Sequence, residues 1–122
     1  MKYIIFLFLF VINTLNAQIE VSTNSVLFYQ YSANECIFKV TETKHIKNHF
    51  KIYKEKLSII SKGKLFKYII VKDYLNDYID KKVWFTEHNE KIIYYINKDV
   101  LILYYNYNKN TYRYDNYIIF YN

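Results

Sequence analysis

Short runs of apolar residues alternate with polar turns along most of the chain, and this pattern predicts β-strands. The turns recur about every eight to twelve residues, a spacing typical of antiparallel sandwiches and barrels. Within the segment 36–42 the alternation has a period of two, because Cys36, Phe38 and Val40 are apolar at every second position. One face of this strand is therefore expected to be buried.

The same pattern predicts further strands, separated by polar segments that suit tight turns. The expected strands cover residues 18–23, 26–31, 36–42, 65–71, 82–87, 91–96, 99–107 and 112–121. We expect an all-β fold, a small antiparallel meander of about eight strands that closes as a barrel or a sandwich. A short helix is expected near 73–80, where Asp73 can cap the first turn and Leu75 and Ile79 share one face.

Residues 49–60 fit two kinds of secondary structure. Four apolar side chains have helical spacing, although the last part of the segment also suits a strand: Phe50, Tyr53, Leu57 and Ile60. Gly63 tolerates a positive φ, which serves either a hairpin turn or the C-terminal cap of a helix. We favour the hairpin because a clear strand follows. The alternative is an α+β fold with a helix at 46–61 packed on the C-terminal sheet.

The first seventeen residues have the features of a secretory signal peptide. Lys2 supplies a positive start, residues 3–12 form an apolar run too short to cross a bilayer, and Ala17 ends a small-residue cleavage context. We therefore expect cleavage near Ala17 and a secreted or periplasmic protein without a retained membrane anchor. Residues 18–122 then form a single small β-rich domain.

The composition supports strands but leaves the meaning of the tyrosines open. The chain holds 16 Tyr, 9 Phe, a single Gly and no Pro, and aromatic residues fit the half-buried surface of a sheet. An AT-rich genome would produce the same bias toward Tyr, Phe, Ile, Asn and Lys, so abundance alone does not indicate a function. With one cysteine, an internal disulfide is impossible.

Positive charge is concentrated in one part of the chain. The formal net charge is +6, and the segment 39–72 holds ten lysines against Glu42 and Glu55. In an exported protein, such a segment suits an anionic envelope surface or an anionic glycan better than nucleic acid. The candidate residues for this contact are Lys44, Lys47, Lys51, Lys54 and Lys56. The alternative is that these lysines keep a tyrosine-rich surface soluble.

Candidate residues for metal binding or catalysis are few. Cys36, His45 and His49 are the only soft ligands close in sequence, and they lack the fourth ligand of a structural zinc site. The same residues could form a cysteine–histidine pair in a hydrolase, but the chain has no glycine-rich loop for an oxyanion hole. We expect a buried Cys36 beside two exposed histidines, and no catalytic residue, metal or cofactor.

The aromatic residues of the predicted C-terminal strands are the best candidates for binding. Rings on one face of adjacent strands form ladders, and tyrosine offers a flat apolar face with a polar tip. The candidate residues are Trp84, Tyr94, Tyr105, Tyr107, Tyr112 and Tyr114. Rings packed in the core would explain the same pattern.

The sequence therefore predicts a non-enzymatic binding or interaction module that holds an apolar or glycan ligand on an aromatic face or in a barrel mouth. A structural or outer-membrane-associated small β-barrel is the alternative. A hydrolase dependent on cysteine and histidine is the third possibility, and it requires an accessible Cys36 near His45 or His49.

Overall fold

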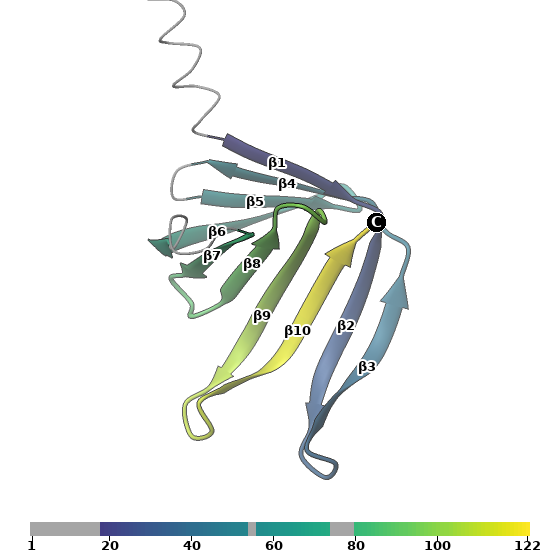
Figure 1. Ribbon diagram of the computed structural model, residues 1–122, viewed down its shortest axis with the longest axis vertical. Helices are drawn as coiled ribbons and strands as arrows, with labels where there is room; N and C mark the ends of the chain where they lie inside the picture. Colours follow the sequence, from purple (N-terminus) through teal and green to yellow (C-terminus); the bar gives the residue numbers. More distant parts are fainter. Residues whose placement is uncertain (1–17, 54–55, 74–79) are drawn as a thin grey trace, which may run out of the picture.

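The computed structural model of the protein describes residues 18–53, 56–73 and 80–122 (Figure 1). These residues form ten strands and no helix. The strands are β1 (Gln18–Thr23), β2 (Ser25–Ser32), β3 (Ile37–Lys44), β4 (Asn48–Tyr53), β5 (Lys56–Ser61), β6 (Lys64–Asp73), β7 (Lys81–Thr86), β8 (Lys91–Tyr95), β9 (Val100–Asn108) and β10 (Arg113–Tyr121). The expected all-β class is confirmed.

All ten strands belong to one antiparallel sheet with the order β1-β4-β5-β6-β7-β8-β9-β10-β2-β3. The stretch from β4 to β10 is a meander in which each strand pairs with the next. The N-terminal hairpin β2–β3 is added beside the last strand, β10. Strands β1 and β3 remain as the two edges, so the sheet does not close into the expected barrel.

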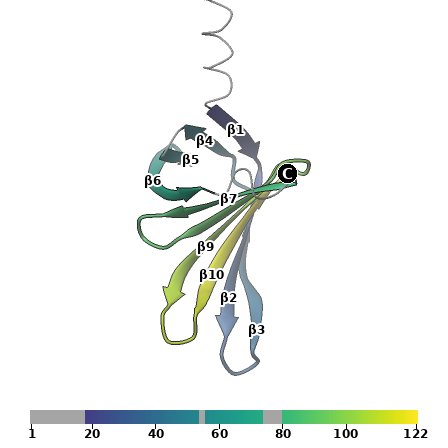
Figure 2. The same cartoon turned by 60° about the vertical axis from the view of Figure 1, so that its left-hand side comes forward.

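The sheet bends on itself, and its two parts enclose the core between them (Figures 1 and 2). Strands β1, β4 and β5 lie over the part that runs from β7 through β10 to β2. Only Asn24 separates β1 from β2, and its backbone N–H donates a hydrogen bond to the carbonyl of Tyr121 at 3.1 Å. The chain therefore passes from one part of the sheet to the other at Asn24.

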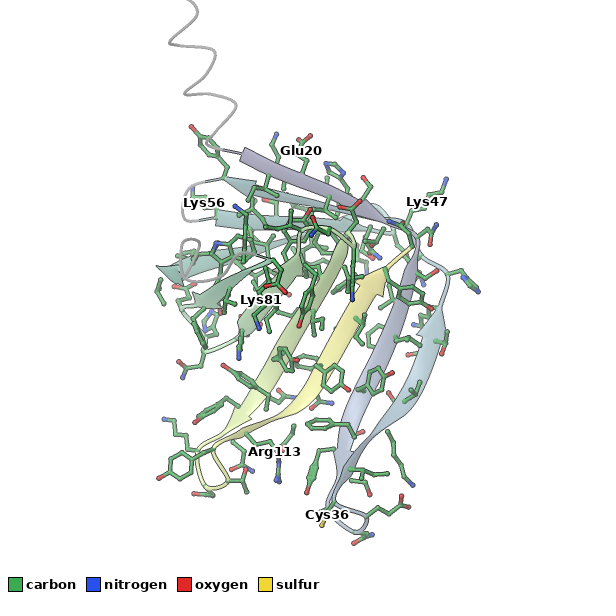
Figure 3. The ribbon with its side chains drawn as sticks, in the orientation of Figure 1. Glu20, Cys36, Lys47, Lys56, Lys81 and Arg113 are labelled. Atoms are coloured by element: carbon green, nitrogen blue, oxygen red, sulfur yellow. The ribbon has the colours of Figure 1, made fainter. Side chains whose placement is uncertain are left out.

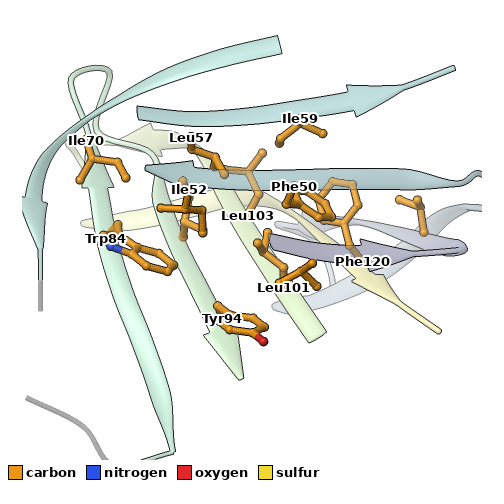
Figure 4. Close-up of a cluster of buried hydrophobic side chains, with 13 residues drawn as sticks. Phe50, Ile52, Leu57, Ile59, Ile70, Trp84, Tyr94, Leu101, Leu103 and Phe120 are labelled. Carbon is orange, nitrogen blue, oxygen red and sulfur yellow. The ribbon is translucent and has the colours of Figure 1, made fainter. Parts of the chain in front are cut away.

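The core consists of alternate side chains from both parts of the sheet (Figure 4). Phe50 in β4 meets Phe120 in β10 edge to face, with ring centroids 4.8 Å apart and planes at 77°. Trp84 in β7 is 1% exposed, and Leu57 in β5 and Ile92 in β8 are fully buried. Burial of such large apolar side chains supplies the main driving force for folding.

The alternative with a helix at 46–61 is wrong, because the described residues of this segment form β4 and β5. Phe50 and Ile52 in β4 face Ile59 and Leu57 in β5 across a continuous antiparallel register. These inward positions have a period of two, which satisfies a strand, and the apparent helical spacing arose because the segment contains two separate strands.

The hairpin expected at Gly63 is confirmed. Gly63 has φ 73° and Lys62 has φ 51°, which matches the two left-handed central residues of a tight hairpin turn. The expected short helix near 73–80 falls mostly on residues 74–79, which lie outside the described residues, and β6 continues to Asp73.

The expected burial of Cys36 is also wrong. Cys36 is exposed and has φ 56° in the turn that precedes β3. Val40, which was expected to share its buried face, is 50% exposed. Val40 is opposite Tyr29, whose neighbour Phe28 packs on the core. Val40 therefore points to the other side of the sheet, and β3 is also an edge strand.

Replacing Phe50 by Ala should lower the free energy of unfolding by about 3 to 5 kcal/mol, because the change removes the side chain that joins the two parts of the sheet. Tyr53 lies on the same strand but is 41% exposed, so Tyr53→Ala should change stability by less than about 1 kcal/mol. Urea denaturation followed by Trp84 fluorescence measures both values. Equal effects of the two changes would contradict this account of the core.

Candidate functional site: an aromatic face

A row of three tyrosines crosses the neighbouring strands β9, β10 and β2. Tyr104 in β9 is opposite Tyr117 in β10, and Tyr117 is opposite Tyr29 in β2. Their neighbours Leu103, Ile118 and Phe28 pack with the core. Because successive side chains of a strand point to opposite faces, the three tyrosines lie on the side away from the core.

Ring contacts extend this row toward β3. Tyr29 stacks on Tyr117 with centroids 4.5 Å apart and planes at 13°. Phe38 in β3 lies 5.0 Å from Tyr117, and Tyr31 in β2 lies 5.3 Å from Phe38. These distances are in the range of favourable aromatic pairs.

A second set of contacts extends the row toward the β9–β10 turn. The ring of Tyr114 lies 5.8 Å from Tyr104 and 5.1 Å from Tyr107. Between them Asn106 has φ 56°, and Asn106 and Asp115 do not pair although their neighbours do. The regular alternation of faces is interrupted there, which explains how Tyr114 contacts rings at both positions.

Together these rings form one continuous surface across four strands, which we call the aromatic face: Tyr29, Tyr31, Phe38, Tyr104, Tyr107, Tyr114 and Tyr117. Tyr107 is 38% exposed, and the other six rings are half-buried. Each ring therefore shields part of its neighbour and keeps part of its surface open to a partner.

Two cations flank the aromatic face. The Arg113 guanidinium lies 3.6 Å from the centroid of the Tyr31 ring, and the Lys91 ammonium lies 5.8 Å from that of Tyr104. The Arg113 Nε is 3.6 Å from a carboxylate oxygen of Asp115, beyond hydrogen-bond distance, and has no hydrogen-bond partner. The Nε–H group itself is buried, but the Arg113 side chain is 36% exposed, so its positive charge can be approached by a ligand.

The hydroxyl groups of the aromatic face resist ionisation. Burial raises the pKa of Tyr104, Tyr114 and Tyr117 above the ordinary value of 10.0. A hydrogen bond with the Cys36 side chain is the main cause that raises the pKa of Tyr31. At neutral pH these hydroxyls therefore remain protonated and can both donate and accept hydrogen bonds.

The structure separates the six tyrosine and tryptophan positions predicted for ligand binding. Tyr107 and Tyr114 belong to the aromatic face. Trp84 is 1% exposed and Tyr94 is 7% exposed, and both pack in the core. Two others lie apart: Tyr105 is opposite Asn116, on the face that alternates with the row of tyrosines, and Tyr112 is 83% exposed in the β9–β10 turn.

Sequence reasoning missed the contribution of the N-terminal hairpin. Tyr29, Tyr31 and Phe38 supply three of the seven rings. Tyr29 and Tyr31 are two positions apart in β2, and Phe38 in β3 is opposite Tyr31. The alternation of Tyr29 and Tyr31 could have indicated that both rings share one face. No signal in the sequence indicated that β2 pairs with β10, because the two strands are far apart in sequence.

A cavity of about 220 Å³ opens between the two parts of the sheet and is the closest equivalent of the expected barrel mouth. Its lining is mainly apolar and includes Phe28, Ile59, Tyr68, Leu103 and Ile118. Pockets for drug-sized ligands usually measure about 300 to 1,000 Å³, so this cavity is small for such a ligand. The aromatic face offers the larger contact surface.

The candidate catalytic and metal-binding residues do not assemble into a site. Cys36 lies at the tip of the β2–β3 hairpin, whereas Lys47, between His45 and His49 in sequence, lies at the opposite end of the sheet (Figure 3). No group of three His, Cys, Asp or Glu side chains within the described ranges could hold a metal ion.

His49 takes part in a contact that resembles part of a catalytic triad. Its Nδ1 lies 2.9 Å from the Ser22 hydroxyl, and its Nε2 lies 3.9 Å from a carboxylate oxygen of Glu20. The carboxylate is beyond hydrogen-bond distance, and the His49 and Glu20 side chains are 42% and 49% exposed. A triad requires an oriented and shielded histidine, so this arrangement is a surface contact.

The lysines predicted to bind an anionic surface lie in different surroundings. Lys44 pairs with Glu42 at 3.0 Å, and Lys51 lies 3.9 Å from Glu20. Lys47 and Lys56 are exposed. Lys54 lies outside the described residues.

Comparison with known proteins adds no relative: the chain matches no protein-family model, no curated protein and no solved structure. Within the described parts of the chain, no helix is long and apolar enough to cross a membrane. The candidate site is therefore defined by its surface chemistry, which consists of stacked and tilted rings, protonated hydroxyls and two flanking cations.

Raising the pH above 10 should destabilise the protein. A tyrosine whose pKa is raised by folding loses its proton first in the unfolded state, so the free energy of unfolding falls as the pH rises through the ordinary value of 10.0. Urea denaturation at about pH 8 and about pH 11 measures the loss. The variant Y104F/Y114F/Y117F should lose less stability over this range, and an unchanged loss would contradict the assignment.

Proposed function

We propose that the protein is an exported, non-enzymatic binding module that recognises an acidic glycan through the aromatic face. The observation that carries the proposal is the unbroken series of ring contacts across β3, β2, β10 and β9 on the side of the sheet away from the core. Burial of the core does not require these rings, because the opposite face of the same strands supplies the core side chains.

The chemistry of the rings fits a carbohydrate. Tyrosine combines a flat apolar face with a hydroxyl, so it can cover the apolar face of a sugar ring and also bond to its hydroxyls. Four strands spaced about 4.8 Å apart give a surface roughly 14 Å wide, which allows contact with more than one sugar ring.

The flanking cations favour an acidic chain over a neutral one. The partly exposed Arg113 guanidinium lies over the Tyr31 ring, and guanidinium groups bind carboxylates and sulfates well. Lys91 adds a second positive charge on the other side of the aromatic face, near Tyr104. A glycan with regularly spaced anionic groups would engage both cations while its rings cover the tyrosines.

Substituting two central rings should weaken glycan binding without unfolding the sheet. The change Y104L/Y117L keeps apolar bulk but removes two aromatic faces, and a loss of about 1 to 3 kcal/mol, roughly tenfold to a hundredfold in Kd, is expected. Isothermal titration calorimetry with polygalacturonate measures the effect, and a neutral glucan tests the preference for acid groups.

The matched control is Tyr112→Leu, because Tyr112 is 83% exposed and has no part in the aromatic face. This variant should bind polygalacturonate as the wild type does. Arg113→Gln should reduce the difference in affinity between acidic and neutral glycans. The proposal fails if the wild type binds neither polymer, or if Tyr112→Leu weakens binding as much as Y104L/Y117L.

Export makes a separate prediction that depends on the N-terminal segment alone. When the full chain is expressed in a Gram-negative host, the protein should be recovered from the periplasm, and mass spectrometry should show a new N-terminus at or near Gln18. The change Lys2→Glu should slow this processing, because it removes the positive start of the signal. Retention of Met1 in a cytoplasmic product would contradict export.

A further inference from the structure

A second unusual surface lies on the other part of the sheet, on the outer side of β4, β5 and β6. The register places three lysines there with apolar neighbours in between: Tyr53 is opposite Lys56, and Lys56 is opposite Ile69. In the next rows Lys51 and Lys67 flank Ser58, and Ile60 is opposite Leu65. We call this surface the lysine-rich face; its apolar members are Tyr53, Ile60, Leu65, Ile69 and Val71.

The apolar side chains of the lysine-rich face are largely exposed to solvent. Ile60 is 47% exposed, Leu65 54%, Ile69 45% and Val71 64%. They alternate along the strands with the buried residues Ile59 and Ile70. Contiguous exposed apolar side chains of this kind mark surfaces that bind a partner or a membrane.

The charge of this face has one sign over most of its area. Lys47, Lys62 and Lys64 are exposed around the rim, in addition to Lys51, Lys56 and Lys67. Two described acidic residues lie beside the face: Glu20 in β1, 3.9 Å from both Lys51 and His49, and Glu87 after β7, whose N–H donates to the Ile69 carbonyl. A partner that covers the face must therefore carry negative charge and also accept exposed Ile and Leu side chains.

We infer that the lysine-rich face docks the protein on the surface of a bilayer that contains anionic lipids. Exposed Ile, Leu and Tyr side chains can enter the boundary between head groups and acyl chains, while lysine ammonium groups reach the phosphates. Each lysine near an anionic surface strengthens binding by about fivefold. The inference goes beyond the proposed glycan binding and does not rest on it.

The position of the face fits this role. The core lies between the two parts of the bent sheet, so the outer sides of these two parts point away from each other (Figures 1 and 2). A protein attached to lipid by β4, β5 and β6 would therefore keep the aromatic face on β9, β10, β2 and β3 away from the bilayer.

Co-sedimentation with vesicles tests the inference. The full chain should bind vesicles of phosphatidylcholine with about one third phosphatidylglycerol, bind pure phosphatidylcholine vesicles at least tenfold more weakly, and lose much of the difference at high salt. The variant K56Q/K67Q should bind the anionic vesicles about 30-fold more weakly. I60S/L65S should weaken binding at least tenfold and should remain weak at all salt concentrations.

Matched variants outside the face serve as controls. K98Q/K109Q removes two exposed lysines from turns elsewhere, and I37S/V40S removes two apolar side chains of β3 that are 52% and 50% exposed. Both should bind the anionic vesicles within about threefold of the wild type. All variants share the same N-terminus, so any contribution of residues 3–12 to vesicle binding is common to all of them.

Three results would overturn the inference. The first is equal binding to both kinds of vesicle, and the second is a loss in K98Q/K109Q as large as that in K56Q/K67Q. The third is a wild-type dimer in size-exclusion chromatography that I60S/L65S converts to a monomer while vesicle binding is unchanged, because the face would then join two copies of the chain. The effect of Y104L/Y117L on glycan binding is measured in a separate experiment, so a negative result for the lysine-rich face does not affect the test of the aromatic face.

Discussion

Phe50 in β4 and Phe120 in β10 meet edge to face across the core, with ring centroids 4.8 Å apart. This contact joins the two parts of the bent sheet, and the rest of the fold depends on that packing. The described residues form strands alone, so no helix is available there to cover one side of the sheet. An amphipathic sheet in water must nevertheless bury its apolar face. Here the sheet bends until its own inner surface is covered, with Phe50, Leu57 and Trp84 at the centre.

This solution leaves the outer side of each part of the sheet uncovered, and the two outer sides differ in chemistry. On β9, β10, β2 and β3 the outer side carries interlocked rings, with ring centroids between 4.5 and 5.8 Å apart. On β4, β5 and β6 it carries lysines between exposed aliphatic side chains. One face suits flat polar rings and the other suits an anionic boundary, so a single small sheet can present two independent binding surfaces pointing in opposite directions.

Tight turns in this chain depend on residues other than glycine. Gly63 serves one hairpin, but within the part of the chain that the structure describes six other residues adopt a positive φ: Cys36, Lys62, Asn89, Asp99, Asn106 and Tyr112. Asn and Asp tolerate this conformation through local hydrogen bonds. Asn108 supports the β9–β10 turn in another way, because its side chain accepts hydrogen bonds from the N–H groups of Asn110 and Thr111. Cys36 and Tyr112 have a less favourable side chain for it, and both lie at hairpin tips away from the core.

Local pattern was sufficient to identify most of the strands, because period-two alternation and polar turns are properties of neighbouring residues. It correctly gave the all-β class and the hairpin at Gly63, but it left a helix at 46–61 open as an alternative, because two short strands there imitate helical spacing. It also correctly indicated that rings on adjacent strands would form a continuous surface. It did not identify the members of that surface, since Trp84 and Tyr94 turned inward and Tyr29, Tyr31 and Phe38 joined from a distant hairpin.

By itself the sequence therefore determined the elements: strands rich in aromatic residues and a basic middle segment. The tertiary structure decided which strands are neighbours, which side of each strand is the inside, and that the sheet bends without closing. These features depend on the pairing of β2 with β10 and of β1 with β4. Such pairings join distant parts of the chain, and their free energy comes from burial shared between strands, which no single segment encodes.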